Sequence, residues 1–509
     1  MKSNAWHYYE FFTNNFSTII RVFFNSLIII FSHSLNSQVL SSGLQFHDKL
    51  NDTTTIAFYK LTRSANEVFE WTDLNSAISF NSAYPRGYND GPVWKGEGTT
   101  VEIHGGVAGK VGKFSYQLLP VLYFSQNNSF DLAPESQSSS SPFNYQFTSG
   151  IDWIQRYGNS SGLYLHPGQS EIKFQNRKLI AAVSTQNYSF GPSTFNPILL
   201  SQQGPGFPHL RIGSDPFPIG KKIGKLEINF LAGLLRESDY FDNITANDNR
   251  YFNAFFMGYS PAFLKNLKVG LGRVLYKQTR YFEPEDLLST IAVLESNERE
   301  GLTTGNDTFD QMASMFIDWS FPAVGFRAYA EFAKNDFTGT TRGTLVEPEH
   351  ARGYTIGFQK ELITQSGGKI NIIYEHTNLS RNQAWLWRAT PSFYSHGVNR
   401  QGYTQNGQLI GAGIGPGGNS DQLMVKLNNE KEQSIGFLFQ RIENNRDYFV
   451  TSVQDFGKHD IEYSFGFSLI KKLQSFTLFS EITLSHNFNR YYLEDATNLA
   501  LLLGTSIDL

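Results

Sequence analysis

Several segments of this chain alternate between apolar or aromatic residues and polar or small residues. The last twelve residues carry the pattern most clearly. Their odd positions are Leu499, Leu501, Leu503, Thr505, Ile507 and Leu509, and their even positions are Asn498, Ala500, Leu502, Gly504, Ser506 and Asp508. A period of two places the two sets on opposite faces of one β-strand. The pattern therefore predicts an amphipathic strand at the C-terminus.

The same alternation recurs between residues 114 and 484, and none of its segments has an apolar stretch long enough for a buried helix. The segments are Phe114–Phe124, Leu226–Leu234, Leu267–Leu271, Ala313–Phe321, Phe326–Phe332, Tyr354–Phe358, Ile435–Phe439, Ile461–Leu469 and Phe476–Leu484. In most of them one face is aliphatic or aromatic and the other is polar or small. The last two are joined by a short connection and are typical of a β-hairpin. Together these segments predict a large antiparallel sheet.

Long polar connections separate some of these strands, notably Phe282–Asp310 and Asn378–Asn419. Outer-membrane barrels have short periplasmic turns and long external loops. We therefore predict an all-β, transmembrane antiparallel barrel over residues 97–509. At about 22 residues per strand with its share of loop, it has about 18 strands. A soluble set of β-sandwich domains also alternates, but it needs repeated units and linkers, and neither occurs after residue 97.

The N-terminal region resembles an export signal. Val22 to Phe31 is the longest apolar run, Arg21 precedes it, and small polar residues follow to Ser37. That length suits a signal peptide rather than a membrane-spanning helix. We predict a signal peptide with an atypical N-terminal extension at residues 1–37, and a periplasmic or lumen segment at residues 38–96. An amphipathic surface helix is the alternative for the apolar run.

Composition supports the same class. Charged residues make up 17% of the chain and aromatic residues 15%, which suits a wall that faces lipid and meets water at aromatic girdles. The chain has no Cys, so disulfides and thiolate metal sites are excluded. The net charge is -4 and no basic stripe is present, so a nucleic-acid partner is not expected.

Some segments match sequence motifs of enzymes, but the residues around them do not predict the local structure that each motif requires. Residues 413–418 match G-x-G-x-x-G, but Pro416 predicts a loop where that fingerprint needs a helix. Residues 158–162 match the G-x-S-x-G elbow, yet the chain after them reads as extended. Residues 347–350 could ligate a metal, but a surface turn is favoured. We expect no enzyme activity, no catalytic residue, no metal and no cofactor, although a barrel hydrolase with a Ser and His pair stays open.

Two groups of residues have the chemistry of sugar recognition, in which aromatic faces stack on sugar rings beside groups that hydrogen-bond hydroxyls. The first group is Tyr84, Arg86, Tyr88, Asp90 and Trp94, and the second is Trp385, Trp387, Arg388, Tyr394 and His396. We nominate both groups as candidate glycan-binding residues. For each residue the alternative is a lumen loop pinned by its own aromatics, or a girdle position at the membrane interface.

Several motifs, in order along residues 80–420, resemble the capsule assembly Wzi family of outer-membrane proteins. They are Tyr84–Trp94 (YPRGYNDGPVW), Gly191–Pro192 after Tyr188–Phe190, Asn196–Leu200 running into Gly206–Leu210, Glu347–Tyr354, and His396 with Gln401–Thr404, Gly407–Gln408 and Gly411–Pro416. The resemblance implies an 18-stranded barrel that acts as a surface lectin for capsule without catalysis. The chain lacks the amphipathic helical array that the family's type member carries at its periplasmic side.

These observations lead to one functional hypothesis. We expect a monomer in the outer membrane of a Gram-negative bacterium, placed there by the barrel-insertion machinery and surrounded by outer-membrane lipid. Its function would be to attach or organise capsular or extracellular polysaccharide at the cell surface. The alternative is a porin or channel for a small solute or oligosaccharide.

Overall fold

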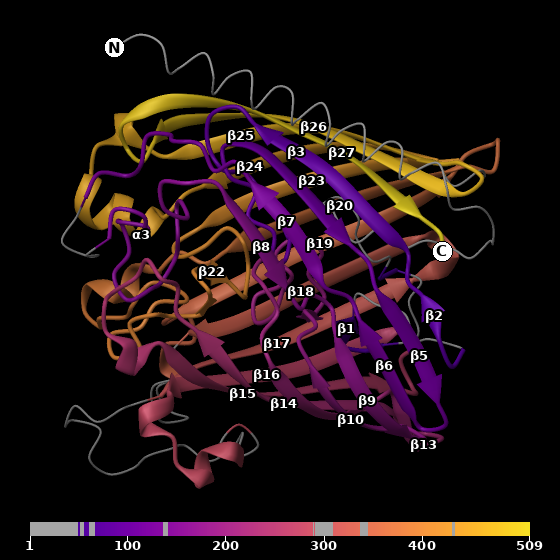
Figure 1. Ribbon diagram of the computed structural model, residues 1–509. Helices are drawn as coiled ribbons and strands as arrows, with labels where there is room; N and C mark the ends of the chain where they lie inside the picture. The colour runs from indigo at the N-terminus through magenta and orange to yellow at the C-terminus, as the bar shows by residue number, and fades with distance from the viewer. Residues whose placement is uncertain are drawn as a thin grey trace.

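An antiparallel β-sheet that closes on itself dominates the molecule (Figure 1). The computed structural model describes residues 49–50, 55–60, 67–135, 141–288, 290, 309–335, 345–429 and 433–509. The predicted signal segment, residues 1–37, lies outside these ranges, as do most of residues 38–66. The predicted all-β barrel is confirmed.

The wall consists of antiparallel strands, most of which pair with the next strand of the wall along the chain. Its first part contains β2 (Glu70–Trp71), β3 (Leu74–Asn81), β4 (Gly98–His104), β5 (Val107–Val111), β6 (Phe114–Leu118), β7 (Val121–Ser125), β8 (Gly162–His166), β9 (Glu171–Asn176), β10 (Leu179–Ser184), β12 (His209–Ser214), β13 (Phe217–Gly220) and β14 (Gly224–Arg236). Its second part contains β15 (Asn249–Pro261), β16 (Leu267–Gln278), β17 (Asp310–Phe321), β18 (Phe326–Asn335), β19 (Arg352–Ile363), β20 (Lys369–Asn378), β23 (Asn419–Asn428), β24 (Ser434–Glu443), β25 (Ile461–Lys472), β26 (Phe476–Arg490) and β27 (Glu494–Ile507). The predicted hairpin of residues 461–484 is confirmed as the pairing of β25 with β26, and β26 continues beyond it to Arg490.

The last strand meets the first long one. β27 pairs with β3 in antiparallel register, with Leu501 opposite Phe80, and this pairing closes the sheet. The wall therefore begins before residue 97, where we predicted its start, because β3 lies within the predicted periplasmic or lumen segment and pairs with both β27 and β4. Breaks divide β4 from β5, β6 from β7 and β8 from β9, so the predicted count of about 18 strands depends on how these are joined and stays a prediction.

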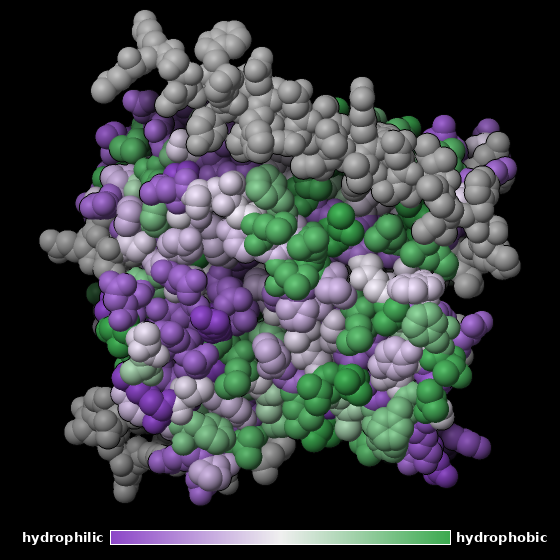
Figure 2. Space-filling model, in the orientation of Figure 1, coloured by the Kyte–Doolittle hydropathy of each residue, from purple (hydrophilic) through white to green (hydrophobic). Residues whose placement is uncertain are grey.

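The alternation sorts side chains between lipid and lumen as the sequence indicates. On β27, Leu499, Leu501 and Leu503 are exposed on the outer face, whereas Asn498 and Ser506 are buried on the inner face. Figure 2 shows hydrophobic residues gathered over the strands and hydrophilic residues toward the end that carries the long loops. Outward apolar side chains lower the free energy of a wall in contact with lipid, and inward polar ones bond to one another in the lumen.

The two ends of the barrel differ. Short turns join β5 to β6, β9 to β10, β17 to β18, β19 to β20 and β25 to β26 at one end. The strands are joined by long connections at the other end, and the described parts of these connections are residues 82–97, 126–135, 141–161, 185–208, 237–248, 279–288, 345–351, 379–418 and 444–460 (Figure 1). The two long connections that the sequence predicted are among them. Following the rule for outer-membrane barrels, we call this the external end.

Segments of the protein itself pack inside the lumen of the barrel. Two small two-stranded sheets lie inside it, β1 (Phe58–Lys60) with β11 (Tyr188–Phe190), and β21 (Thr404–Gln405) with β22 (Gln408–Leu409). A buried apolar cluster joins these segments to the inner face of the wall. It includes Phe58, Ile151, Phe190, Leu199, Phe252, Phe256, Tyr276, Phe316, Tyr394, Tyr403 and Ile410. Residues far apart in sequence thus share one core inside the barrel.

Part of the N-terminal region enters the lumen. The backbone N–H groups of Ile56 and Ala57 both donate to Glu227 Oε2 at 2.8 Å, and Glu227 is a buried residue of β14. Pairing of β1 with β11 places the described residues 55–60 against the loop that precedes β12. A carboxylate on the wall therefore holds the N-terminal segment inside the barrel.

The helical segments whose bounds the structure describes are short. They are η1 (Thr245–Asn247), η2 (Thr279–Tyr281), η3 (Pro284–Leu288), η4 (Pro322–Val324), η5 (Gln383–Leu386), α3 (Arg446–Tyr448), η6 (Phe449–Val453) and η7 (Phe456–Lys458). In the described part of the chain, no helix combines the length and the apolar composition needed to cross a membrane.

Candidate functional site

The loop of residues 82–97 folds into the external mouth of the barrel. Asn81, the last residue of β3, holds both ends of this loop through its side-chain amide, which donates to the carbonyls of Arg86 (3.1 Å), Lys95 (3.0 Å) and Gly96 (3.2 Å). Asn81 is buried, so these bonds are shielded from water. One polar side chain at the end of a wall strand thus fixes the shape of the loop.

Tyr84 and Arg86 contact the part of the wall formed by β24, β25 and β26, which follow β27 beside β3. The Tyr84 hydroxyl donates to Glu462 Oε2 at 3.3 Å, and the Arg490 guanidinium lies 4.0 Å from the centre of the Tyr84 ring. Arg86 donates to Gln440 Oε1 at 3.0 Å and lies 3.7 Å from Glu462. Burial raises the pKa of Tyr84, and the Glu462 charge adds to that effect, so its hydroxyl stays protonated and remains a donor.

Tyr88 and Asp90 tie the same loop to its neighbours. The Tyr88 hydroxyl donates to Asn196 Oδ1 at 2.7 Å and accepts from Gln422 Nε2 at 3.1 Å. Asp90 pairs with Lys95 Nζ at 2.5 Å and accepts the backbone N–H of Tyr88 at 2.6 Å. These bonds hold both side chains in place at the edge of the cavity described below.

Trp94 is held from two sides. Its indole N–H donates to Asn127 Oδ1 at 3.3 Å, and its ring meets the Tyr157 ring edge-on with 4.9 Å between ring centres. Asn127 in turn donates to the Tyr157 carbonyl at 2.8 Å. The indole is half-buried, so part of its surface remains open. A half-exposed, rigidly held indole is suited to stacking.

All five residues of the first predicted group line one cavity of about 240 Å³. Other loops and strand ends complete it with Tyr145, Trp153, Gln203, Gln408, Asp460, Glu462, Arg490 and Tyr491. Its charged lining residues are three cations, Arg86, Lys95 and Arg490, and three carboxylates, Asp90, Asp460 and Glu462. The cavity therefore combines aromatic rings with a balanced set of hydrogen-bonding groups.

Sequence reasoning missed the partners that come from distant loops. Trp153 lies in a connection of residues 126–161 that carries no alternation, and Arg490 and Tyr491 lie at the tip of the β26–β27 hairpin. The adjacent Tyr491 and Tyr492 at a strand end are the one local signal that could have marked the hairpin tip. Both adopt positive φ, +58° and +62°, which turns the chain tightly at this point.

The structure does not bring the second predicted group together. Trp385 lies beneath the Arg381 guanidinium, 5.0 Å from it, and Arg388 pairs with Glu347 at 3.2 Å. Trp387 is 69% exposed. Tyr394 is fully buried, where its hydroxyl donates to the Ile198 carbonyl and accepts from Ala412, both at 2.8 Å. Since its ring packs in the lumen core, Tyr394 has no face open to a ligand.

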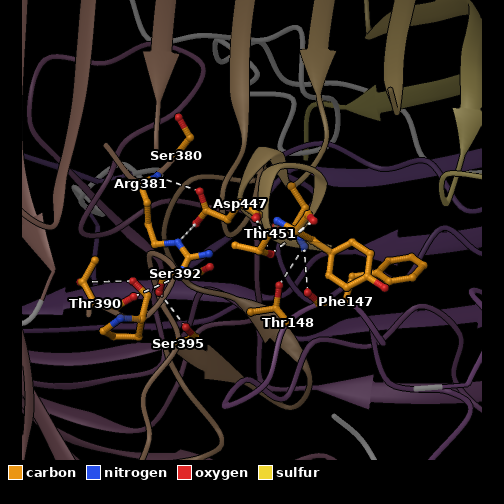
Figure 3. Close-up of polar contacts among 12 residues, drawn as sticks. Phe147, Thr148, Ser380, Arg381, Thr390, Ser392, Ser395, Asp447 and Thr451 are labelled. Carbon is orange, nitrogen blue, oxygen red and sulfur yellow. Dashed lines mark hydrogen bonds and ion pairs between the residues drawn. The ribbon is translucent and has the colours of Figure 1, made fainter. Parts of the chain in front are cut away.

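His396 lines a second cavity at the external end, of about 330 Å³. Figure 3 shows its surroundings, in which Arg381, Asp447, Ser392 and Thr148 lie close together. Three loops form it, residues 126–161, 379–418 and 444–460. The backbone N–H of His396 donates to the Gly150 carbonyl at 2.9 Å, which joins two of these loops.

The segments that match enzyme motifs are loops or turns. Residues 158–161 precede β8, which begins at Gly162, and Asn127 of the loop before them donates to the Ser160 carbonyl at 3.1 Å. Residues 413–418 form turns without a following helix, since β23 begins at Asn419. Residues 348–350 form a turn. The predicted loop and turn character of all three segments is confirmed.

Comparisons with known proteins place this geometry among outer-membrane barrels. No protein-family model matches the sequence, and no curated protein matches it. Among solved structures, Wzi from Escherichia coli, an outer-membrane protein involved in group 1 capsule assembly and described as a carbohydrate-binding β-barrel, aligns with a TM-score of 0.56. The alignment has 13% sequence identity and covers 86% of this chain and 84% of Wzi. This chain is similar in fold to Wzi.

Two porins from Pseudomonas aeruginosa align less well. OccK7 has a TM-score of 0.42, with 10% identity over 87% of this chain and 98% of its own. OprD has a TM-score of 0.41, with 9% identity over 89% and 98%. The structural resemblance to Wzi that the motifs predicted is confirmed at the level of the fold, which is that of a Gram-negative outer-membrane β-barrel.

Proposed function

We propose that this protein is a surface lectin of the outer membrane that attaches or organises capsular or extracellular polysaccharide without catalysis. The observation that carries the proposal is the cavity of about 240 Å³ at the external mouth. All five residues nominated from the motif Tyr84–Trp94 line this cavity. Its lining combines two indoles, Trp94 and Trp153, with the polar side chains of Arg86, Asp90 and Gln408. Aromatic faces with fixed donors and acceptors around them are the means by which proteins hold sugars non-covalently.

Rigidity of the cavity supports the same proposal. Asn81, Tyr84, Tyr88 and Trp94 each bond to a wall strand or to another loop, so the lining is ordered before a ligand arrives. Preorganised groups lose little conformational entropy on binding, which favours affinity for a ligand. The similarity in fold to Wzi, which is described as a carbohydrate-binding β-barrel, supports the same proposal.

The alternative is a porin or channel, and packing of the lumen argues against it. Phe190, Phe256, Phe316 and Tyr403 belong to one buried cluster inside the barrel, together with side chains of the wall. An open pore needs a continuous path of water, whereas this cluster occupies the lumen with apolar side chains. We therefore expect little steady current through the protein.

Deletion of the gene in its native host tests the proposal. The measurement is the partition of polysaccharide between cells and medium, with total polymer as the internal reference. A lectin that attaches polymer predicts unchanged synthesis and a shift of polymer into the medium. An unchanged partition contradicts the proposal, and steady conductance of the purified protein in a planar bilayer would then support the porin.

A further inference from the structure

The second cavity differs from the first in its charge. Arg381, His396 and Arg400 line it, and no Asp or Glu is among its described lining residues. The first cavity, in contrast, has equal numbers of cations and carboxylates. Arg400 is exposed, and no described carboxylate forms an ion pair with it. The second cavity therefore has an excess of positive charge.

Arg381 is held firmly in this cavity. Its Nε lies 3.3 Å from Asp447 Oδ2, its Nη1 donates to the Thr390 carbonyl at 3.2 Å, and its guanidinium stacks on the Trp385 ring. Its backbone N–H also donates to Asp447 Oδ1 at 2.7 Å. Figure 3 shows the dashed contacts between Arg381 and Asp447. Asp447 fixes the arginine and offsets one positive charge, which leaves the charge of Arg400 uncompensated among the described residues.

The rest of the lining suits a sugar ring. Phe147 and Tyr448 form an aromatic wall, with 4.7 Å between their ring centres. Hydroxyl groups of Thr148, Ser392 and Ser395 line the same space. A volume of about 330 Å³ is in the range of small-ligand pockets. Aromatic rings can cover the apolar face of a pyranose while hydroxyls bond its rim.

The two cavities share one aromatic cluster as a wall. Tyr145, Trp153 and Tyr491 of this cluster line the first cavity, and Phe147 and Tyr448 line the second. Asn445 bonds across it, since its amide donates to Thr148 Oγ1 at 2.9 Å while the residue also lines the first cavity. A polymer that lies across the external mouth could therefore contact both cavities.

We propose that the second cavity binds the carboxylate of a uronic acid unit, so that the polysaccharide recognised by this protein is acidic. The inference rests on the proposed lectin function and names its substrate class. A planar guanidinium matches the geometry of a carboxylate, and a bond to a charged group is stronger than one to a neutral hydroxyl. The first cavity, whose charges balance, then holds a neutral part of the same chain.

Calorimetric titration of the full-length protein, folded in detergent, tests this assignment. The probe is an oligogalacturonate, and the comparison is the same oligomer after its carboxyl groups have been reduced to alcohols. Arg400→Gln removes the uncompensated charge at an exposed position and should leave folding intact. We expect it to weaken oligogalacturonate binding roughly tenfold or more, and to leave the reduced oligomer unaffected.

The matched control is Arg236→Gln. Arg236 ends β14 at the external end, its side chain is 64% exposed, and it is absent from both cavities. Loss of affinity in Arg400→Gln but not in Arg236→Gln supports the uronate site over general charge attraction. Equal binding of acidic and reduced oligomers, or equal losses in both variants, overturns the site but leaves the lectin standing. Binding of neither oligomer overturns the uronate site, and the partition of polysaccharide in the deletion strain then decides whether the protein is a lectin.

Discussion

Glu375 on β20 accepts the backbone N–H of Asn196 at 2.7 Å inside the barrel. The same carboxylate accepts the N–H of Thr194 at 2.6 Å and that of Phe195 at 3.1 Å, and the Tyr329 hydroxyl donates to it at 2.8 Å. A single fully buried wall residue thus binds three consecutive amides of the loop that fills the lumen. Such contacts between the wall and the inner loops keep these loops packed inside the lumen.

We expect Glu375→Ala to release residues 185–208 from the wall. A hydrogen bond to a charged group contributes about 1.5–3 kcal/mol, so loss of the set outweighs the local stability of a loop. The wall should persist, while backbone amides of the loop exchange faster and conductance in a planar bilayer rises. Glu361→Ala, at the opposite end of the neighbouring strand β19, is the control. Unchanged exchange and conductance in Glu375→Ala would contradict this role.

The wall could be predicted from sequence because its signal is local. The spacing of Leu499, Leu501 and Leu503 is enough to assign them to the outer face of the strand. This alternation is required because one face of the wall contacts lipid. The lumen could not be predicted in this way. Arg250 donates to the carbonyls of Gly402 and Thr404, some 150 residues away, and no periodic pattern marks such a contact.

The candidate site was predictable in part for the same reason. One contiguous motif contributed Tyr84, Arg86, Tyr88, Asp90 and Trp94, so recognising the motif located five lining residues together. Residues 385–396 also have the composition of a glycan-binding segment, but an aromatic ring in a polar loop can equally well pack into the buried core. Tyr394 is such an anchor, and its burial depends on Ile198 and Tyr403 from other parts of the loops.

A pair of tryptophans tests the first cavity. Trp94→Ala should weaken binding of a neutral oligosaccharide roughly three- to tenfold, because an aromatic contact contributes about 0.5–1.5 kcal/mol. Trp387→Ala removes the same side chain from an exposed position outside both cavities and should not change affinity. Isothermal titration of both variants makes the comparison. Equal losses of affinity, or a loss in Trp387→Ala alone, would move the site away from the cavity.

Gly150 is expected to control the shape of the second cavity. It has φ of +72°, and a Cβ at this position would collide with the backbone carbonyl of His396. Gly150→Ala should therefore strain the contact between the two loops and cost about 1–3 kcal/mol locally. Hydrogen exchange around residues 394–400 should rise, and oligogalacturonate binding should weaken. Gly397→Ala, in the same loop with open space around it, is the control and should change neither measurement.

We expect Asp460 to make the stability of the external loops depend on pH. Burial raises its pKa from 3.8 to about 6, against the opposing effect of hydrogen bonds from Asn444 and from the N–H of Tyr491. A carboxyl whose pKa is higher in the folded state favours folding most below its unfolded pKa, and this contribution is lost as the pH rises through about 6. The shift corresponds to at most about 3 kcal/mol.

We therefore expect wild type to lose stability relative to Asp460→Asn as the pH rises from 4 to 7, since asparagine does not titrate. The free energy of unfolding in urea, measured in lipid vesicles for both proteins at each pH, gives the difference directly. Any cost of asparagine that does not depend on pH cancels in this comparison. Asp455→Asn removes an exposed carboxylate from the same loop and serves as the matched control. A constant difference between wild type and Asp460→Asn across this range would mean that the Asp460 carboxyl does not titrate there. The loop would then be equally stable on a neutral and on an acidified cell surface.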